Sequence, residues 1–203
     1  MTTLENQPRP VAQRGDAKYS WDDAIAAIGK DFSGGRVNVG QEKIEYTSVV
    51  RYCEVWEIGN PIYWYEDVAK QAGYKGVVAP WSSIKQTFTY TGFWRPGDPS
   101  HFPVGIDINA NTFIAASPEE EEVERVPKPP TSQGIVTDLS IELFEPVLVG
   151  DTLTVKGSKL VNVRPRETRI GVGAFMNRES LVLNQRGELV VRLNQGGFSY
   201  NPK

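Results

Sequence analysis

The sequence offers few side chains suited to nucleophilic or metal-assisted chemistry. It contains one histidine, His101, and one cysteine, Cys53, so a structural zinc site and an internal disulfide framework are not indicated. Ser82 and Ser83 lie in no Gly-x-Ser-x-Gly turn and have no histidine nearby, which argues against a serine nucleophile. Proton transfer by carboxylates or by a tyrosine is therefore the chemistry to consider.

The most suggestive spacing lies in residues 56–81, WEIGNPIYWYEDVAKQAGYKGVVAPW. An Asn60-Pro61 pair leads into a helical stretch, which a Gly-flanked apolar segment follows. The carboxylates of that stretch, Glu66 and Asp67, are expected to be exposed on ordinary burial preferences. Tyr63 can donate a hydrogen bond, but a phenol with the ordinary pKa of about 10 is a poor base at neutral pH.

Hydrophobic periodicity divides the chain into a helix-rich first half and a strand-rich second half. Val49, Cys53 and Trp56 recur at helical spacing, so one face of a helix over residues 48–57 is expected to be buried. From residue 134 apolar and polar residues alternate, which predicts four antiparallel strands whose turns carry VGD, RPRE and NQRGE. This order of elements is typical of an α+β domain. The other predicted elements are helices over residues 20–32, 62–73 and 82–91 and a strand over residues 36–46.

Capping residues predict where several of these helices begin and end. Ser20 is expected to cap the first helix, and Gly34 with Gly35 to end it. Thr47 or Ser48 is expected to cap the helix over 48–57. Gly73 is the predicted stop of the helix over 62–73.

Length, charge and composition limit the class of protein. The 203 residues predict one domain over 19–203 behind a flexible tail, 1–18. The net charge of −3 argues against a nucleic-acid partner. No apolar run approaches the roughly 18–20 residues of a membrane span, and the polar N-terminus with the single cysteine predicts a cytoplasmic protein. The run of glutamates in 117–130 is interpreted as a solvated loop.

Residues 56–81 and the strands that follow resemble the MaoC-like enoyl-CoA hydratases and β-hydroxyacyl dehydratases, and most closely the fungal-fatty-acid-synthase-type dehydratases. The signature of catalytic members reads Asp-x-Asn-Pro-x-His. Residues 146–175, PVLVGDTLTVKGSKLVNVRPRETRIGVGAF, resemble the family's Pro-x-x-x-Gly-Asp strand pair, and 184–200, NQRGELVVRLNQGGFSY, its closing strands. The resemblance implies a single hot-dog fold, an antiparallel sheet wrapped around a central helix, here with an extra N-terminal helix and long loops.

The signature departs from the family pattern at its functional positions. The Asp position is Ile58 and the His position is Tyr63, so neither family proton-transfer group is present. The glycine whose N–H forms the oxyanion hole falls on Trp81, whose N–H is retained but whose indole is expected to crowd the site. We therefore assign no catalytic residue. The resemblance implies substrate-binding roles for Asn60, Tyr63, Trp64 and Trp81.

These departures predict a non-catalytic, pocket-forming subunit of a heteromeric enoyl-CoA hydratase or 3-hydroxyacyl-thioester dehydratase, in fatty-acid or steroid side-chain metabolism. Its expected partners are an acyl-CoA thioester and a hot-dog subunit with the Asp and His intact, or a second copy in a homodimer, without a cofactor or a metal ion. One alternative is a self-sufficient hydratase or thioesterase that uses Tyr63 and a displaced carboxylate. Another is a non-catalytic acyl-CoA-binding module.

Two further groups of residues have a functional and a structural interpretation. Arg164, Arg166 and Arg169 suit a CoA phosphate, but a charged hairpin turn is the favoured interpretation. His101 lies in a proline-rich loop, where an exposed histidine without an orienting partner is expected.

Overall fold

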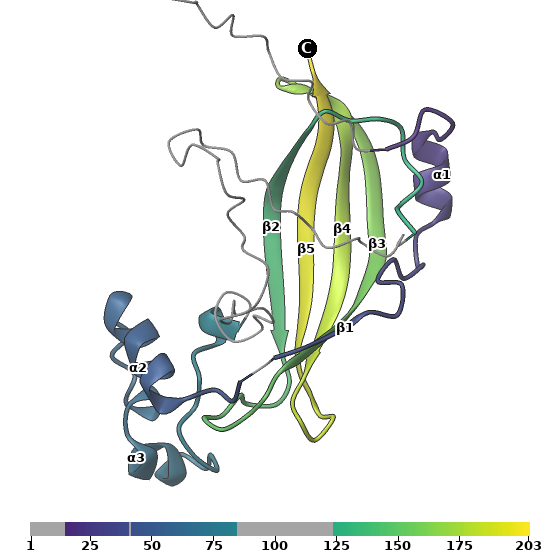
Figure 1. Cartoon of the computed structure of the whole chain (residues 1–203). Helices are drawn as coiled ribbons and strands as arrows, with labels where there is room; N and C mark the ends of the chain where they lie inside the picture. The colour runs from purple at the N-terminus through teal and green to yellow at the C-terminus, as the bar shows by residue number, and fades with distance from the viewer. Residues whose placement is uncertain (1–14, 41, 85–123) are drawn as a thin grey trace, which may run out of the picture.

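A five-stranded antiparallel sheet forms the body of the protein (Figure 1). The computed structural model describes residues 15–40, 42–84 and 124–203. The strands follow the order β1-β3-β4-β5-β2, and their bounds are β1 Val37–Val39, β2 Gln133–Leu143, β3 Thr154–Thr168, β4 Gly171–Leu183 and β5 Leu189–Pro202. The helices are α1 Trp21–Ala26, α2 Tyr46–Val55 and α3 Glu66–Gln71, with 3₁₀ turns η1 Pro61–Tyr63 and η2 Trp81–Ser83.

The helices lie at two separate places on this sheet. Figure 1 shows α1 beside β3 in the upper half and α2 with α3 projecting at the lower end of the strands. No helix within the described ranges is long and apolar enough to cross a membrane. The predicted helix over 82–91 is described only to residue 84, and His101 and the glutamate run lie outside the described residues.

The four predicted long strands are confirmed, but one turn was misplaced. RPRE lies inside β3, where Pro165 is opposite Ala174, and the turn falls at Arg169 and Ile170. Proline lacks an N–H and is normally excluded from central strands. It is tolerated here because, among the described strands, β1 pairs only with residues 154–156 of β3, which leaves Pro165 without a strand neighbour on that side.

The predicted helices are shorter than the patterns indicate. Ser20 caps α1 in a capping box with Asp23, but α1 ends at Ala26 because the chain turns at Gly29, with φ of +95°, and Asp31 bridges to Lys159. The helix expected over 62–73 is divided into η1 and α3. Gly73 follows α3 with φ of +92°, as predicted for a stop.

Two other boundaries were also wrong. α2 begins at Tyr46, and Glu45 caps it without a side-chain hydrogen bond, so neither Thr47 nor Ser48 is the cap. The strand expected over 36–46 is limited to the three residues of β1.

Two hydrophobic clusters pack against one face of the sheet, which we call the core face. The first lies beneath α2 and joins Val49 and Cys53 to strand residues such as Val182 and Leu193. The second lies beneath α1 and joins Ala24 to Leu160 and Ala174. α2 and α1 therefore each cover a different part of the core face, because the apolar side of each helix is buried against the sheet.

A buried carboxylate links the sheet to the segment before β3. Asp151 is 2% exposed and accepts the Leu148 N–H at 2.9 Å, the Gln185 side-chain amide at 2.9 Å and the Arg186 guanidinium at 3.1 Å. Residues 147–149 in turn pair with 77–79 through the Val78–Leu148 bridge. Asp151 thus fixes the position of residues 147–149. Residues 77–79, near the end of the 56–81 stretch, pair with that segment.

Replacing Asp151 by Ala is expected to destabilise the protein by about 1–3 kcal/mol, because a buried acceptor is removed and its donors lose their partner. Urea unfolding followed by circular dichroism measures this effect. The control is Glu54→Gln, which breaks the exposed ion pair with Arg51 and should leave the midpoint almost unchanged. Equal midpoints for the two variants would contradict the role given to Asp151.

Candidate functional site

The candidate site is built on the C-terminal end of α2. The Glu57 N–H donates to the Glu54 carbonyl at 3.2 Å and the Ile58 N–H donates to the Cys53 carbonyl at 2.9 Å. These two bonds form a Schellman motif, which normally places glycine in the left-handed conformation after the helix. Here Glu57 occupies that position with φ of +50°. The motif turns the chain from α2 into the Asn60-Pro61 pair.

Ile58 occupies the position where the signature has its aspartate, and the Ile58 side chain packs against apolar neighbours. It is half-buried and packs against the first hydrophobic cluster. Its carbonyl accepts the Trp64 indole N–H at 2.7 Å. An aliphatic side chain cannot exchange a proton, so this position serves to close the helix end.

Asn60 and Pro61 begin the next turn. The Asn60 side-chain oxygen accepts the Ile62 N–H at 3.3 Å, and Pro61 takes the first position of η1. This is the usual arrangement of an Asn cap followed by proline. Asn60 was predicted to bind substrate; the contact that the structure gives its side chain is this cap.

Tyr63 occupies the position of the signature histidine. Its ring is half-buried against the first cluster. Burial raises the pKa of the Tyr63 phenol above its ordinary value, and the neighbouring Cys53 and Tyr74 raise the same pKa further. The phenol is therefore protonated at neutral pH and can donate a hydrogen bond, but it does not act as a base.

Trp64 fixes the relative position of these residues. Its indole bonds to Ile58, and its carbonyl accepts the Tyr46 hydroxyl at 2.8 Å. The indole packs against the same cluster as Ile58 and Tyr63. The structure thus packs Ile58, Tyr63 and Trp64 against one hydrophobic cluster, and we call these three side chains the apolar wall. The spacing of the signature did not predict the two hydrogen bonds of Trp64, because they depend on how α2 and η1 meet.

Trp81 is separate from this wall. It begins η2, its side chain is 54% exposed, and it is not among the residues packed against the first cluster. The retained oxyanion-type N–H and the crowding by the indole both stay predictions. Val78 connects the two regions, because its N–H donates to the Ile62 carbonyl at 3.2 Å.

The remaining candidates lie on the surface. Glu66 is exposed and pairs with Lys70 at 2.7 Å, and Asp67 is also exposed. Arg164 and Arg166 are exposed on β3, and Arg169 is exposed in the turn that follows. None of these side chains meets the apolar wall in the described contacts.

The sheet and site together define the class of protein. A long antiparallel sheet with a helical segment at the lower end of its core face and an Asn-Pro turn after that helix is the architecture of a MaoC-like hot-dog dehydratase. Residues 26–193 match the family model described as "FAS1-like, dehydratase domain region". The chain belongs to this family.

Three known proteins illustrate the relationship. The chain is 24% identical over 170 residues to a Thermomonospora curvata protein named "Probable enoyl-CoA hydratase alpha subunit"; the match covers 83% of this chain and 49% of that protein. The chain therefore spans about half the length of this relative. It resembles a chain of the ChsH1-ChsH2 complex from Mycobacterium tuberculosis, with a TM-score of 0.62, 19% identity and coverage of 90% and 96%. It also resembles a MaoC-like dehydratase from Rhodospirillum rubrum, with a TM-score of 0.51, 17% identity and coverage of 87% and 94%.

Replacing Glu57 by Gly is expected to stabilise the protein by about 1 kcal/mol, because a left-handed conformation costs a non-glycine residue roughly that amount. For a protein of this size the melting temperature should rise by about 2–4 °C, measured by differential scanning calorimetry. Glu57→Ala keeps the steric penalty and is the matched control. A glycine variant no more stable than the alanine variant would contradict the motif.

Proposed function

We propose that this chain is the non-catalytic subunit of a heteromeric enoyl-CoA hydratase or 3-hydroxyacyl-thioester dehydratase and that it forms one wall of the substrate pocket. The membership of the hot-dog dehydratase family supports the reaction class. The wall is the surface made by Ile58, Tyr63 and Trp64. It is apolar and suits an acyl group better than it suits a charged one.

The observation that carries this proposal is the chemistry at the two signature positions. Hydration of an enoyl thioester requires a base that activates water and an acid that protonates the α-carbon. Ile58 supplies neither, and the raised pKa of Tyr63 prevents its use as a base. A partner with an intact Asp-x-Asn-Pro-x-His signature would provide both groups.

The edge of the sheet offers a surface for that partner. Among the described strands β2 pairs with β5 alone, and apolar residues along it are exposed, among them Ile135, Val136 and Leu139. A long edge strand with exposed apolar side chains invites pairing with a second sheet. The relative named as an alpha subunit and the ChsH1-ChsH2 complex both point to assembly with another chain.

The two alternatives have less support in the described residues. A self-sufficient enzyme needs a displaced carboxylate near Tyr63, but Glu66 is exposed and paired with Lys70. A non-catalytic acyl-CoA-binding module would use the same apolar wall. No described contact favours this alternative over the pocket-forming subunit. Activity with and without a partner separates all three.

The purified chain is expected to show no hydration of crotonyl-CoA or longer enoyl-CoA esters, because it lacks a proton-transfer pair. Co-expression with a small hot-dog protein from a neighbouring reading frame that has the intact signature should give activity, followed as loss of enoyl absorbance. In that complex Tyr63→Phe should retain most turnover, whereas replacing the partner's signature Asp by Asn should abolish it.

Each alternative makes its own prediction in the same assay. Ordinary turnover by the chain alone, or complete loss on Tyr63→Phe, would indicate a self-sufficient enzyme. Acyl-CoA binding without activity in any complex would indicate the binding module.

Replacing Leu139 by Lys is expected to prevent assembly while preserving the fold, because an edge lysine opposes strand pairing. Size-exclusion chromatography with light scattering measures the assembly. The matched control is Val172→Lys, which places the same charge on an exposed apolar residue of β4. Assembly that tolerates the first variant, or is lost in both, would exclude β2 as the interface.

A further inference from the structure

A groove of about 670 Å³ crosses the middle of the core face. Leu193, from the first hydrophobic cluster, lines it at one end, and Met176, which packs against the second cluster, lines it at the other. The groove therefore occupies the part of the sheet between the regions covered by α2 and by α1. Leu193 belongs to the cluster against which Ile58, Tyr63 and Trp64 pack, so one end of the groove lies at the same cluster as the proposed site.

The lining of this groove is polar in its middle and contains one charged side chain, Arg178, among the described residues that form it. Arg178 is opposite Leu160 on β3 and Gln195 on β5, and cross-strand partners point to the same face. The other hydrogen-bonding side chains of the lining are Asn38, Ser158, Ser180, Gln195 and Ser199.

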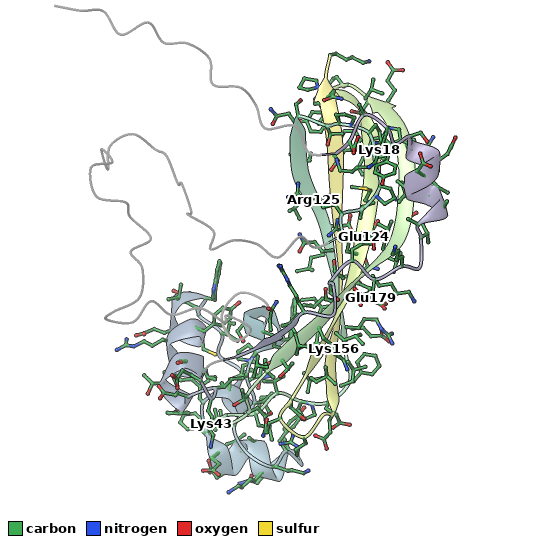
Figure 2. All side chains as sticks on the ribbon, turned by 45° about the vertical axis from the view of Figure 1, so that its right-hand side comes forward. Lys18, Lys43, Glu124, Arg125, Lys156 and Glu179 are labelled. Atoms are coloured by element: carbon green, nitrogen blue, oxygen red, sulfur yellow. The ribbon has the colours of Figure 1, made fainter. Side chains whose placement is uncertain are left out.

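Arg178 has no carboxylate partner in the parts of the chain that the structure describes. Its guanidinium donates to the Ser158 hydroxyl at 3.3 Å. Glu179 lies on the opposite face, since side chains alternate along a strand, and pairs there with Arg192 at 3.5 Å. Figure 2 shows Glu179 at the middle of the sheet, between the α1 end and the α2–α3 end. The carboxylate of Asp31 accepts the N–H groups of Ser33 and Ser158 at 2.8 and 2.9 Å.

The guanidinium of Arg178 is partly desolvated, although the residue as a whole is exposed. The atoms around the guanidinium remove part of its hydration and lower its pKa. Arginine nonetheless stays charged in proteins. A plain hydrocarbon chain in the groove would remove more water from this charge and return no hydrogen bond. A carboxylate would accept two parallel N–H bonds from it.

We propose that the groove binds the distal part of the acyl group of the thioester substrate and that Arg178 pairs there with a carboxylate carried by that acyl group. This inference rests on the proposed function, because the thioester end is taken to lie at the apolar wall. It specifies the substrate class as an acyl thioester with a distal carboxylate, which Arg178 would bind beside the Ser158 hydroxyl.

The test uses saturated thioesters, which bind without being hydrated. Octanoyl-CoA and its ω-carboxy counterpart, suberoyl-CoA, are titrated by calorimetry into the full chain in complex with its hot-dog partner. The complex is expected to bind suberoyl-CoA about tenfold more tightly, the factor that corresponds to one charged hydrogen-bonded pair of roughly 1.4 kcal/mol. Arg178→Gln should abolish this preference while octanoyl-CoA binding persists, and Arg178→Lys should retain part of it.

Lys156→Gln is the matched control. Lys156 is opposite Leu181 on the face of the sheet that carries Glu179, so its replacement should leave the preference unchanged. Equal affinity of the wild-type complex for the two esters would overturn the inference and leave the proposed function intact. A preference that survives in Arg178→Gln would overturn it as well.

A second arm separates failure of this inference from failure of the proposed function. Free suberate is titrated into the chain without CoA. If the complex binds neither ester, the proposed function fails, and suberate binding that is lost in Arg178→Gln would still support the carboxylate site. Absence of suberate binding together with absence of ester binding would overturn both. If Arg178→Gln does not fold, the partial loss expected for Arg178→Lys decides the outcome.

Discussion

The carboxylate of Asp151 is the interaction on which the arrangement of the candidate site depends. It joins the segment before β3 to the β4–β5 hairpin through Gln185 and Arg186. The same segment pairs with residues 77–79, and Val78 bonds to the Ile62 carbonyl in η1. A chain of hydrogen bonds therefore runs from the sheet to the signature turn. A buried carboxylate is stable only when its oxygens accept hydrogen bonds. The bonds that Asp151 accepts therefore favour this one arrangement of the segment before β3 and the hairpin.

Around that framework the chain forms the Asn-Pro turn of the signature but presents other side chains there. Asn60 caps η1 and Pro61 begins it, and the Schellman motif ends α2. The side chains that these turns present are Ile58 and Tyr63, which pack rather than transfer protons. A signature turn without the proton-transfer groups fits the proposed wall of a pocket that another chain completes. Among the described strands β2 is an edge of the sheet, and the proposed partner would join the sheet there.

The core face combines two kinds of surface. Its ends are apolar and covered by helices, whereas its middle carries Arg178 and several hydroxyl and amide groups. A uniformly apolar face would suit an unsubstituted acyl chain. Arg178, the one charged side chain of the described groove lining, places a cation between the two apolar clusters. Electrostatic contacts of this kind contribute selectivity beyond that of apolar burial.

Alternation of apolar and polar residues determined the four long strands and their antiparallel order, and the Asn-Pro signature determined the family. The resemblance also predicted that Ile58 and Tyr63 stand at the positions of the family's acid–base pair. The sequence pattern misplaced the turn after β3, because whether Pro165 is tolerated depends on how far β1 extends along β3. Only the tertiary structure decided that Trp64 bonds to Ile58, that Asp151 meets Arg186, and that Arg178 stands without a carboxylate partner in the described residues. Those contacts join residues far apart or on different elements, and local periodicity contains no information about which distant side chains meet.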